Sequence, residues 1–406
     1  MTLTKSRYQI DDRKIVIFGA GKIGRSFIGQ LFGMGGYKVV FIDNNPVIVD
    51  LLNDRQSYRI IIKGEEEQEI RIQNVSAINS SDLNEVSESV SSAGILAVSV
   101  GKNALGKIIP AIAEGLKLRY ERNPDYPLDI IIAENLRNAN RFLYDGLIKM
   151  LPSDYSIDSL VGLIETSIGK MVPVMTPSEL DKDPLMIFAE PYNTLILDGK
   201  AFKSTIPDIA GLAPKENMKA WVDRKAFIHN LGHATAAYYG FYRNPESVYL
   251  YEVMEDSNVL HFTRNVMLQS ADILRSVYPG EFTAEDLEDH IDDLILRFRN
   301  KALRDTLFRI GHDLTRKLAS GDRFIGALNL ALQTGKPFDK ILKAMSFGFT
   351  FSAKDEDGNA FPSDSEFLAA VSKDFESALL KNLGLNKEMD KEIIADLKKQ
   401  YILNII

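Results

Sequence analysis

Residues 14–32 read KIVIFGAGKIGRSFIGQLF, and this stretch decides the fold of the N-terminal half. The apolar run at 14–18 is typical of a strand that is buried on both faces of a parallel sheet. Glycines 19, 21 and 24 follow with G-x-G-x-x-G spacing, and a helical stretch comes next. Gly19 permits a tight turn, Gly21 lets the backbone approach a pyrophosphate, and Gly24 allows the helix to pack closely on the strand. The stretch predicts a strand, a phosphate-binding turn and a helix.

An acidic residue ends the next strand-like run. Lys38–Ile42 is apolar and is followed by Asp43, 19 residues after Gly24. A carboxylate there is placed to accept the adenosine ribose hydroxyls, and it would repel a 2′-phosphate, so we predict NAD rather than NADP. The helix N-terminus offers free N–H groups to the phosphates. A glycine-rich turn that binds nothing is the alternative. The predicted cofactor residues here are Gly19, Ala20, Gly21, Lys22, Ile23, Gly24, Asp43 and Asn44.

The remainder of the N-terminal half alternates strand-like and helix-like segments. Ser57–Ile72 alternates like a β-hairpin. Apolar runs at Ile95–Val100 and Leu128–Ala133 flank a helical segment at Ala104–Leu118. This order predicts a parallel, doubly wound sheet that binds its ligand at the C-terminal strand ends. Ordinary strand-to-helix turns are the alternative for the residues at those ends. The candidates for the nicotinamide side are Ser99, Val100, Gly101, Glu134 and Asn135.

The pattern becomes mainly helical beyond residue 200, so we place a domain boundary there. Strand-like pieces precede it at 160–168, 184–188 and 192–197. We therefore predict an α/β Rossmann-type NAD-binding domain at 1–200 and a mainly α-helical catalytic and substrate domain at 201–406. Helices are expected at Lys215–Tyr239, Glu246–Ser276, Thr283–Arg299 and Lys301–Lys317, with several more after 320.

Within the first of these helices, residues 225–233 read KAFIHNLGH. At ~100° per residue, Asn230 and His233 fall ~140° and ~80° round the helix from Lys225. One broad face therefore presents an amine, an amide and an imidazole, which suits oxidation of an alcohol. The lysine can remove the hydroxyl proton if burial or a nearby cation lowers its pKa from ~10.4. The other two side chains can hold the oxygen while hydride leaves the carbon.

The same stretch has two other interpretations. Scattered polar side chains on a helix are often solvated or satisfied within the core. His229 and His233 also have the spacing of the zinc helix H-E-x-x-H. However, Asn230 stands where the general-base carboxylate would be, the chain has no cysteine, and no third ligand is evident. We therefore predict no metal.

Composition limits the possible partners. The net charge of -8 disfavours general nucleic-acid binding, and no run of ~18 apolar residues or signal-peptide core is present. We expect a cytoplasmic enzyme that acts on a small molecule, without a nucleic-acid or membrane partner. We also expect a monomer, with an oligomer left open.

Basic residues dominate the stretch 297–323. This excess favours an anionic substrate such as a phosphate ester or carboxylate, and the alternative is a solvated helix face. The eight are Arg297, Arg299, Lys301, Arg304, Arg309, Arg316, Lys317 and Arg323.

From about Lys14 to Phe351 the chain resembles the polyol-specific long-chain dehydrogenases. The matching segments are FGAGKIGRSFIGQLF, AVSVGKNALGKIIPAIAEGL, IIIAENL, RIGHDLTRKLASGDR and the signature K-x4-N-x2-H. The resemblance implies that Lys225 is the general base and that Asn230 and His233 bind and polarise the reacting oxygen. It places Asn135 at the nicotinamide side as a further catalytic residue. It implies substrate binding by Lys225, Asn230, His233, Arg309, Arg316 and Lys317.

Within that family the chain is most similar to members that oxidise D-mannitol 1-phosphate to D-fructose 6-phosphate with NAD and no metal. Two departures affect substrate identity: Gly169 replaces an Asp of the family pattern V-D-R-I-x-P, and His312 stands where such members tend to carry Arg. The same chemistry on a free polyol or a hexuronate stays open, as in mannitol 2-dehydrogenases or tagaturonate and fructuronate reductases. A non-catalytic NAD(H)-binding sensor is the alternative from a different class.

Overall fold

The computed structural model describes residues 9–136, 138–388 and 390–405, and the chain divides into two compact units, Met1–Met218 and Lys219–Ile406. Strand β11 (Leu212–Lys215) pairs in parallel with β10 (Leu195–Asp198) and so belongs to the sheet of the first unit. The division therefore comes after β11, later along the chain than residue 200.

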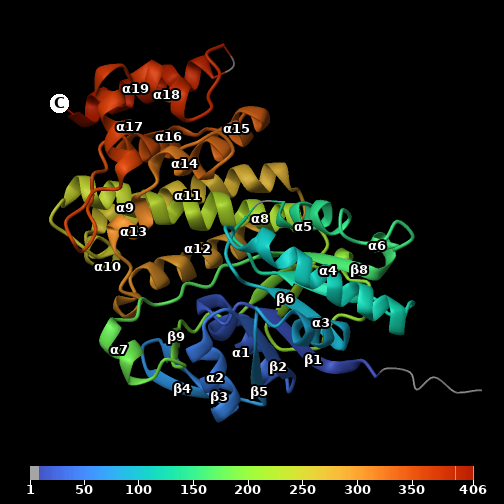
Figure 1. Ribbon diagram of the computed structural model, residues 1–406. Coiled ribbons are helices and arrows are strands. Elements are labelled where there is room, and N and C mark those ends of the chain that lie inside the picture. The colour runs from blue at the N-terminus through green and yellow to red at the C-terminus, as the bar shows by residue number, and fades with distance from the viewer. Residues whose placement is uncertain (1–8, 137, 389, 406) are drawn as a thin grey trace, which may run out of the picture. The chain divides into compact units, whose positions relative to one another are not determined.

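The first unit is built on an eight-stranded sheet with the order β11-β10-β8-β7-β6-β1-β2-β5. Figure 1 labels its strands β8, β6, β1, β2 and β5. The run from β8 to β5 is parallel, as predicted, and β10 pairs antiparallel with β8 at one side. The six parallel strands are β1 (Asp11–Phe18), β2 (Lys38–Asp43), β5 (Val75–Asn79), β6 (Ala93–Val98), β7 (Leu128–Ile132) and β8 (Val161–Ser167).

Strand β1 is apolar at successive positions because both faces of the sheet are covered. Ile15 and Ile17 enter a core shared with α1 and a small second sheet, whereas Val16 and Phe18 enter a core shared with α3, α4 and α5. The helices of this unit are α1 (Gly29–Met34), α2 (Pro46–Arg55), α3 (Leu83–Ser91), α4 (Leu105–Arg122), α5 (Ala139–Leu147), α6 (Ile157–Leu160) and α7 (Pro177–Lys182).

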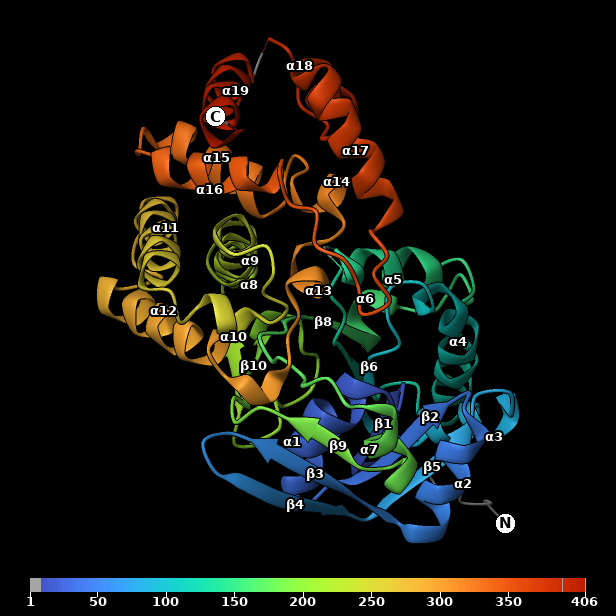
Figure 2. The same cartoon turned by 90° about the vertical axis from the view of Figure 1, so that its left-hand side faces the viewer.

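The predicted hairpin forms part of the second sheet. Strands β3 (Ser57–Lys63) and β4 (Glu67–Gln73) pair antiparallel, and β9 (Ile187–Ala189) joins β3 in parallel. Figure 2 shows the three strands side by side. Tyr58 and Ile60 are buried against the α1 side of the main sheet, so this hairpin closes one face of the first unit.

The second unit is helical, as predicted. Figure 2 views α9 and α11 nearly end-on, with α16 to one side and α12 to the other. The longer helices are α9 (Leu231–Arg243), α11 (Ser257–Val277), α12 (Ala284–Phe298), α15 (Arg323–Thr334), α16 (Asp339–Gly348), α17 (Pro362–Lys373), α18 (Phe375–Asn382) and α19 (Lys391–Ile405). No helix among the described residues has the length and apolar composition needed to cross a membrane.

Two helices expected from the sequence are divided in the structure. The stretch Glu246–Ser276 contains α10 (Leu250–Val253) and then α11, because the Asp256 side chain caps a new helix by accepting from the Asn258 N–H. The stretch Lys301–Lys317 contains η4 (Lys301–Leu303), α13 (Leu307–Gly311) and α14 (Leu314–Lys317).

The second division has a clear local cause. Arg304 and Asp313 have φ of 51° and 68°, in the left-handed region that does not continue a right-handed helix. Thr306 then caps α13 by accepting from the Arg309 N–H. The basic side chains of this stretch therefore sit on three short turns rather than along one helix face.

Candidate functional site

The glycine turn after β1 has the shape that a dinucleotide requires. Gly19 has φ 96°, and an added Cβ there would lie 2.5 Å from the Ser99 carbonyl oxygen. A Cβ on Gly24 would lie 2.0 Å from the Gly19 carbonyl oxygen, so a side chain is excluded at both positions. At Gly21, by contrast, an added Cβ meets nothing within 4 Å. The exposed backbone at Gly21 and Lys22 is thus open to a pyrophosphate, while the outer glycines hold the turn closed.

Asp43 is fixed beside this turn by two backbone hydrogen bonds. Its Oδ2 accepts from the Ala20 N–H at 2.7 Å, and its Oδ1 accepts from the Asn45 N–H at 2.9 Å. Each carboxylate oxygen keeps a second lone pair, and the side chain is only partly buried. The carboxylate is therefore held where it can accept ribose hydroxyls, with Asn44 exposed next to it.

The ends of β6 and β7 lie beside the same turn. The Ser99 N–H donates to the Phe18 carbonyl, and the Ala133 N–H donates to the Val98 carbonyl. Glu134 is buried, and its Oε1 accepts from the N–H groups of Val100 and Gly101 at 2.7 and 2.8 Å. Burial raises the pKa of Glu134, although these two bonds oppose the rise. Glu134 thus joins the two strand ends, and the adjacent Asn135 is exposed.

The predicted catalytic helix of the second unit contains a local irregularity. Between α8 (Met218–Arg224) and α9, residues Lys225–Asn230 form a π-helical turn, η3. A π-helix bonds residue i to residue i+5, so Lys225 and Asn230 return to nearly the same side of the helix. His233, three α-helical residues further on, lies ~60° from Asn230. The angles predicted for a regular helix are therefore wrong, and the three side chains share a narrower face.

The environment of Lys225 suits proton abstraction. Its ammonium form is disfavoured by burial and by the Arg323 guanidinium, which together lower the pKa of Lys225 from 10.5 to about 8. The side chain of Arg323 is 10% exposed, and its Nη1 donates to the Asn230 carbonyl at 3.3 Å. Asp322 accepts from the Arg323 Nε at 2.9 Å. Arg323 was one of eight basic residues in the sequence, and only the fold identifies it as the cation beside the lysine.

His233 is held on two sides. Its ring stacks on Phe298 with centroids 4.7 Å apart and planes at 8°. Its Nε2 lies 3.4 Å from Oδ2 of Asp305, a side chain that is 4% exposed. Burial lowers the pKa of His233, and Asp305 opposes that effect only in part. The imidazole is therefore neutral near pH 7. Phe298 and Asp305 could not be identified as neighbours of His233 from the sequence, because nothing in their spacing links them to it.

The other predicted substrate residues occupy two different environments. Arg309 is exposed, and its guanidinium is paired with Asp305. Arg316 is also exposed and contacts Asp313 and, at 3.8 Å, Asp322.

Lys317 is 5% exposed, and its amine donates to the Ile310 carbonyl. Burial and then Arg323 and Arg316 lower the pKa of Lys317 to about 7. The positive charge expected of the basic run is therefore substantially offset by carboxylates and by burial.

The histidines considered for zinc lie near each other. The His229 and His233 rings are 6.0 Å apart, and burial lowers the pKa of His229 well below its ordinary value. Across residues 9–136, 138–388 and 390–405, no group of three or more His, Cys, Asp or Glu side chains is placed to hold a metal ion.

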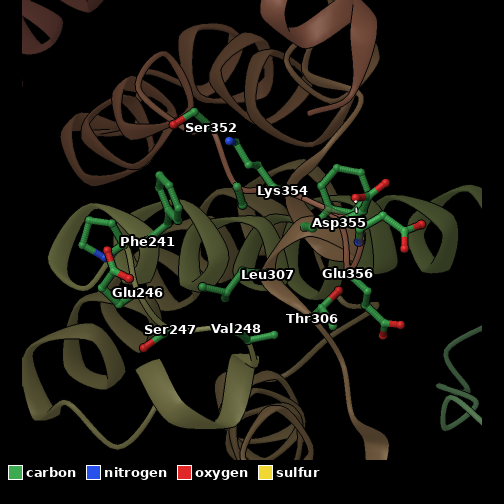
Figure 3. A pocket seen from close by; sticks show the side chains of 14 residues that line it. Phe241, Glu246, Ser247, Val248, Thr306, Leu307, Ser352, Lys354, Asp355 and Glu356 are labelled. Carbon is green, nitrogen blue, oxygen red and sulfur yellow. Dashed lines mark hydrogen bonds between the residues drawn. The ribbon is translucent and has the colours of Figure 1, made fainter. Parts of the chain in front are cut away.

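A cavity of about 850 Å³ lies elsewhere in the second unit. Figure 3 shows Phe241, Val248 and Leu307 among its lining side chains, together with the acidic Glu246 and Glu356. None of the predicted catalytic or substrate residues lines it. It is therefore distinct from the candidate site.

The Rossmann-type unit with its open glycine turn, and the helical unit with its lysine, amide and imidazole, define a dinucleotide-dependent oxidoreductase. A family model described as the mannitol dehydrogenase Rossmann domain matches residues 13–211. A second, described as the mannitol dehydrogenase C-terminal domain, matches residues 217–401. The chain belongs to the mannitol dehydrogenase family.

Two solved structures of other proteins share this fold. One is a Pseudomonas fluorescens mannitol 2-dehydrogenase in a ternary complex with NAD and D-mannitol, with 16% identity and a TM-score of 0.72, covering 99% of this chain and 92% of that one. Another is a D-sorbitol dehydrogenase in substrate-free form, with 17% identity and a TM-score of 0.78, covering 98% and 95%. At these identities the likeness establishes the fold.

Proposed function

We propose that the protein transfers hydride between the secondary alcohol of a polyol and NAD, with Lys225 as the general base. The observation that carries the proposal is the π-helical turn, which gathers Lys225 and Asn230 on one side of the helix and leaves His233 close by. A partly buried amine with a pKa of about 8 is neutral in a useful fraction of molecules near pH 7 and can accept a hydroxyl proton.

Each residue then has a defined task. Lys225 removes the hydroxyl proton and returns it when the reaction runs toward the ketose. The Asn230 amide donates to the reacting oxygen, where negative charge develops as the proton leaves. Asn135 stays a prediction for the same oxygen and the nicotinamide side. Arg323 disfavours protonation of Lys225 and is fixed by Asp322 and the Asn230 carbonyl.

NAD, when bound, accepts the hydride. The residues that would hold it are the open backbone at Gly21 and Lys22 for the pyrophosphate and the Asp43 carboxylate for the adenosine ribose. A 2′-phosphate beside Asp43 would bring two anions together, so NADP is disfavoured. The mannitol 2-dehydrogenase of similar fold is described in complex with NAD, which agrees with this assignment.

For the substrate we propose an uncharged polyol. Arg309, Arg316 and Arg323 each have a carboxylate partner, and burial lowers the pKa of Lys317 to about 7. An added phosphate would have to compete with those carboxylates for the arginines. The two dehydrogenases of similar fold are described by free polyols, mannitol and sorbitol.

A second candidate is the phosphate ester, D-mannitol 1-phosphate. The basic groups Arg316, Lys317 and Arg323 favour it, since both arginines contact Asp322 and both lower the pKa of Lys317. An anion placed among them would raise the pKa of Lys317 again and gain a charged partner.

The deciding experiment measures NAD reduction with D-mannitol, D-sorbitol and D-mannitol 1-phosphate, and NADH oxidation with the corresponding ketoses and with tagaturonate and fructuronate. A kcat/KM that is highest for a free polyol sustains the proposal. A preference of more than ~10-fold for the phosphate ester selects the second candidate, since that corresponds to ~1.4 kcal/mol of transition-state binding. If no substrate is turned over although NADH binds tightly, the result favours the alternative of a non-catalytic NAD(H)-binding sensor.

A further inference from the structure

Asp305 is a buried carboxylate whose two oxygens have different partners. Its Oδ1 accepts from the Arg309 Nε at 2.5 Å and also contacts Nη2 of the same guanidinium. Its Oδ2 faces Nε2 of His233 at 3.4 Å. Within the described residues both atoms are buried, and neither has a hydrogen-bond partner in this structure. Buried polar atoms are nearly always satisfied, and these two face each other at 3.4 Å, so a small approach joins them in a hydrogen bond.

The chemistry of the two groups determines which atom carries the hydrogen. Burial works to raise the pKa of Asp305, but His233 and Arg309 outweigh it and hold the pKa below its ordinary value. An ionised carboxylate can only accept. A hydrogen bond that joins Oδ2 and Nε2 must therefore carry its hydrogen on Nε2. A neutral imidazole with Nε2–H leaves Nδ1 as a bare acceptor.

The orientation of the ring is restricted in a second way. Phe298 stacks on His233 with an interplanar angle of 8°, which fixes the ring plane, and Asp305 fixes the rotation within that plane. Together they determine both the direction and the hydrogen-bonding character of Nδ1.

We infer that Asp305 is a positioning residue that holds His233 as the Nε2–H tautomer, so that Nδ1 accepts a hydrogen bond from a hydroxyl of the bound polyol. The inference rests on the proposed function for the identity of the substrate. This changes the role expected for His233. The ring does not donate a hydrogen bond to the reacting oxygen, but accepts one from a hydroxyl group of the substrate. Asp305 acts through the ring and through Arg309, without contacting the substrate.

Asp305→Asn tests this with a side chain of the same shape. The Arg309 guanidinium has only donors, so the new amide turns its oxygen toward Arg309 and its NH₂ toward His233. Nε2 must then accept and the proton moves to Nδ1, so the substrate hydroxyl can no longer donate to the ring and must turn its own hydrogen to another acceptor. We expect kcat/KM for the polyol to fall by roughly 10–100-fold, while the Kd for NADH stays within about 2-fold.

Asp293→Asn is the matched control. Asp293 pairs with Arg297 at the same i,i+4 spacing as Asp305 and Arg309. Loss of an ordinary helical ion pair should leave kcat/KM within about 2-fold. Equal loss in both variants, or an unchanged kcat/KM in Asp305→Asn, overturns the inference.

The tautomer can also be observed without any turnover. The ¹⁵N NMR signals of His233 can be identified in histidine-labelled wild type by their absence in His233→Gln. We expect these signals to show a protonated Nε2 and an unprotonated Nδ1. Asp305→Asn should show the reverse. A protonated Nδ1 in the wild type refutes the inference, even if the variant does not fold. If no polyol is turned over, the proposed function fails while this spectrum still decides the role of Asp305.

Discussion

Replacing Arg323 should change the pH at which Lys225 loses its proton and becomes able to act as the base. At pH 7, an amine of pKa about 8 is neutral in roughly one molecule in eleven, against roughly one in three thousand at the ordinary pKa of 10.5. Neutral Lys225 is the active form for oxidation. The kcat/KM for polyol oxidation should therefore rise about tenfold per pH unit below 8 and level off above it.

Burial is the larger cause of the low pKa of Lys225, and Arg323 is the smaller. Removing the guanidinium charge in Arg323→Gln should thus raise the pKa of Lys225. The rise should be less than half of the difference between about 8 and the ordinary pKa of 10.5. The midpoint of the pH profile should rise by about one pH unit at most, which lowers kcat/KM at pH 7 by up to ~10-fold. At pH 10 the variant and the wild type should converge, because Lys225 is then neutral in both.

The assay is NAD reduction under kcat/KM conditions from pH 6 to pH 10.5. Arg323→Lys is the control, because it keeps a cation near Lys225 and should keep the midpoint near 8. A loss in Arg323→Gln that is equal at every pH would show that Arg323 acts only by holding Asn230 in place. A wild-type profile that is flat from pH 6 to pH 10 would refute Lys225 as the base.

Three further outcomes are expected. Lys225→Ala should lower kcat by ~10²–10⁴ while NADH fluorescence titration gives an unchanged Kd, and a kcat close to wild type would remove Lys225 from the mechanism. Asp43→Ser removes the carboxylate that accepts from Ala20, so the ratio of kcat/KM for NAD to that for NADP should fall; an unchanged ratio would exclude Asp43 from cofactor selection. Gly169→Asp introduces the residue of the family pattern, and its Cβ would lie in ordinary contact 3.4 Å from the Tyr192 hydroxyl oxygen. The free energy of unfolding in urea should therefore change by less than ~1 kcal/mol. A larger loss of stability would mean that the position has no room for a side chain.

The N-terminal half was the more predictable part of the chain. Its β1 strand, glycine turn and Asp43 are consecutive local signals, and short-range sterics link each one to the next. The structure confirms the parallel sheet and the hairpin for the same reason. The helical half was less predictable, because positive φ at Arg304 and Asp313 and the cap at Thr306 divide a stretch whose apolar periodicity suggests one helix.

The candidate site shows the same limit at the level of side chains. Lys225, Asn230 and His233 are near one another in sequence and could be proposed from their spacing. Their partners could not: Asp305 is 72 positions beyond His233, and Arg323 is 98 beyond Lys225. Such long-range pairs depend on packing of α9 against α13 and of η3 against α15, which periodicity does not encode.

The π-helical turn connects the site residues that are close in sequence with their partners that are distant in sequence. A regular α-helix would turn Asn230 ~140° away from Lys225, so the two side chains would lie farther apart around the helix than they do in the π-helical turn. The wider turn has poorer backbone geometry and persists only where surrounding contacts maintain it, which is why such turns concentrate at functional sites. Here Ser270 donates to the Phe227 carbonyl at 2.6 Å and Arg323 donates to the Asn230 carbonyl, so both α11 and α15 hold backbone oxygens of the turn. Arg323 therefore contributes to the shape of the site as well as to its charge, and the Arg323→Lys control separates the two because a lysine keeps the charge and loses the forked donor.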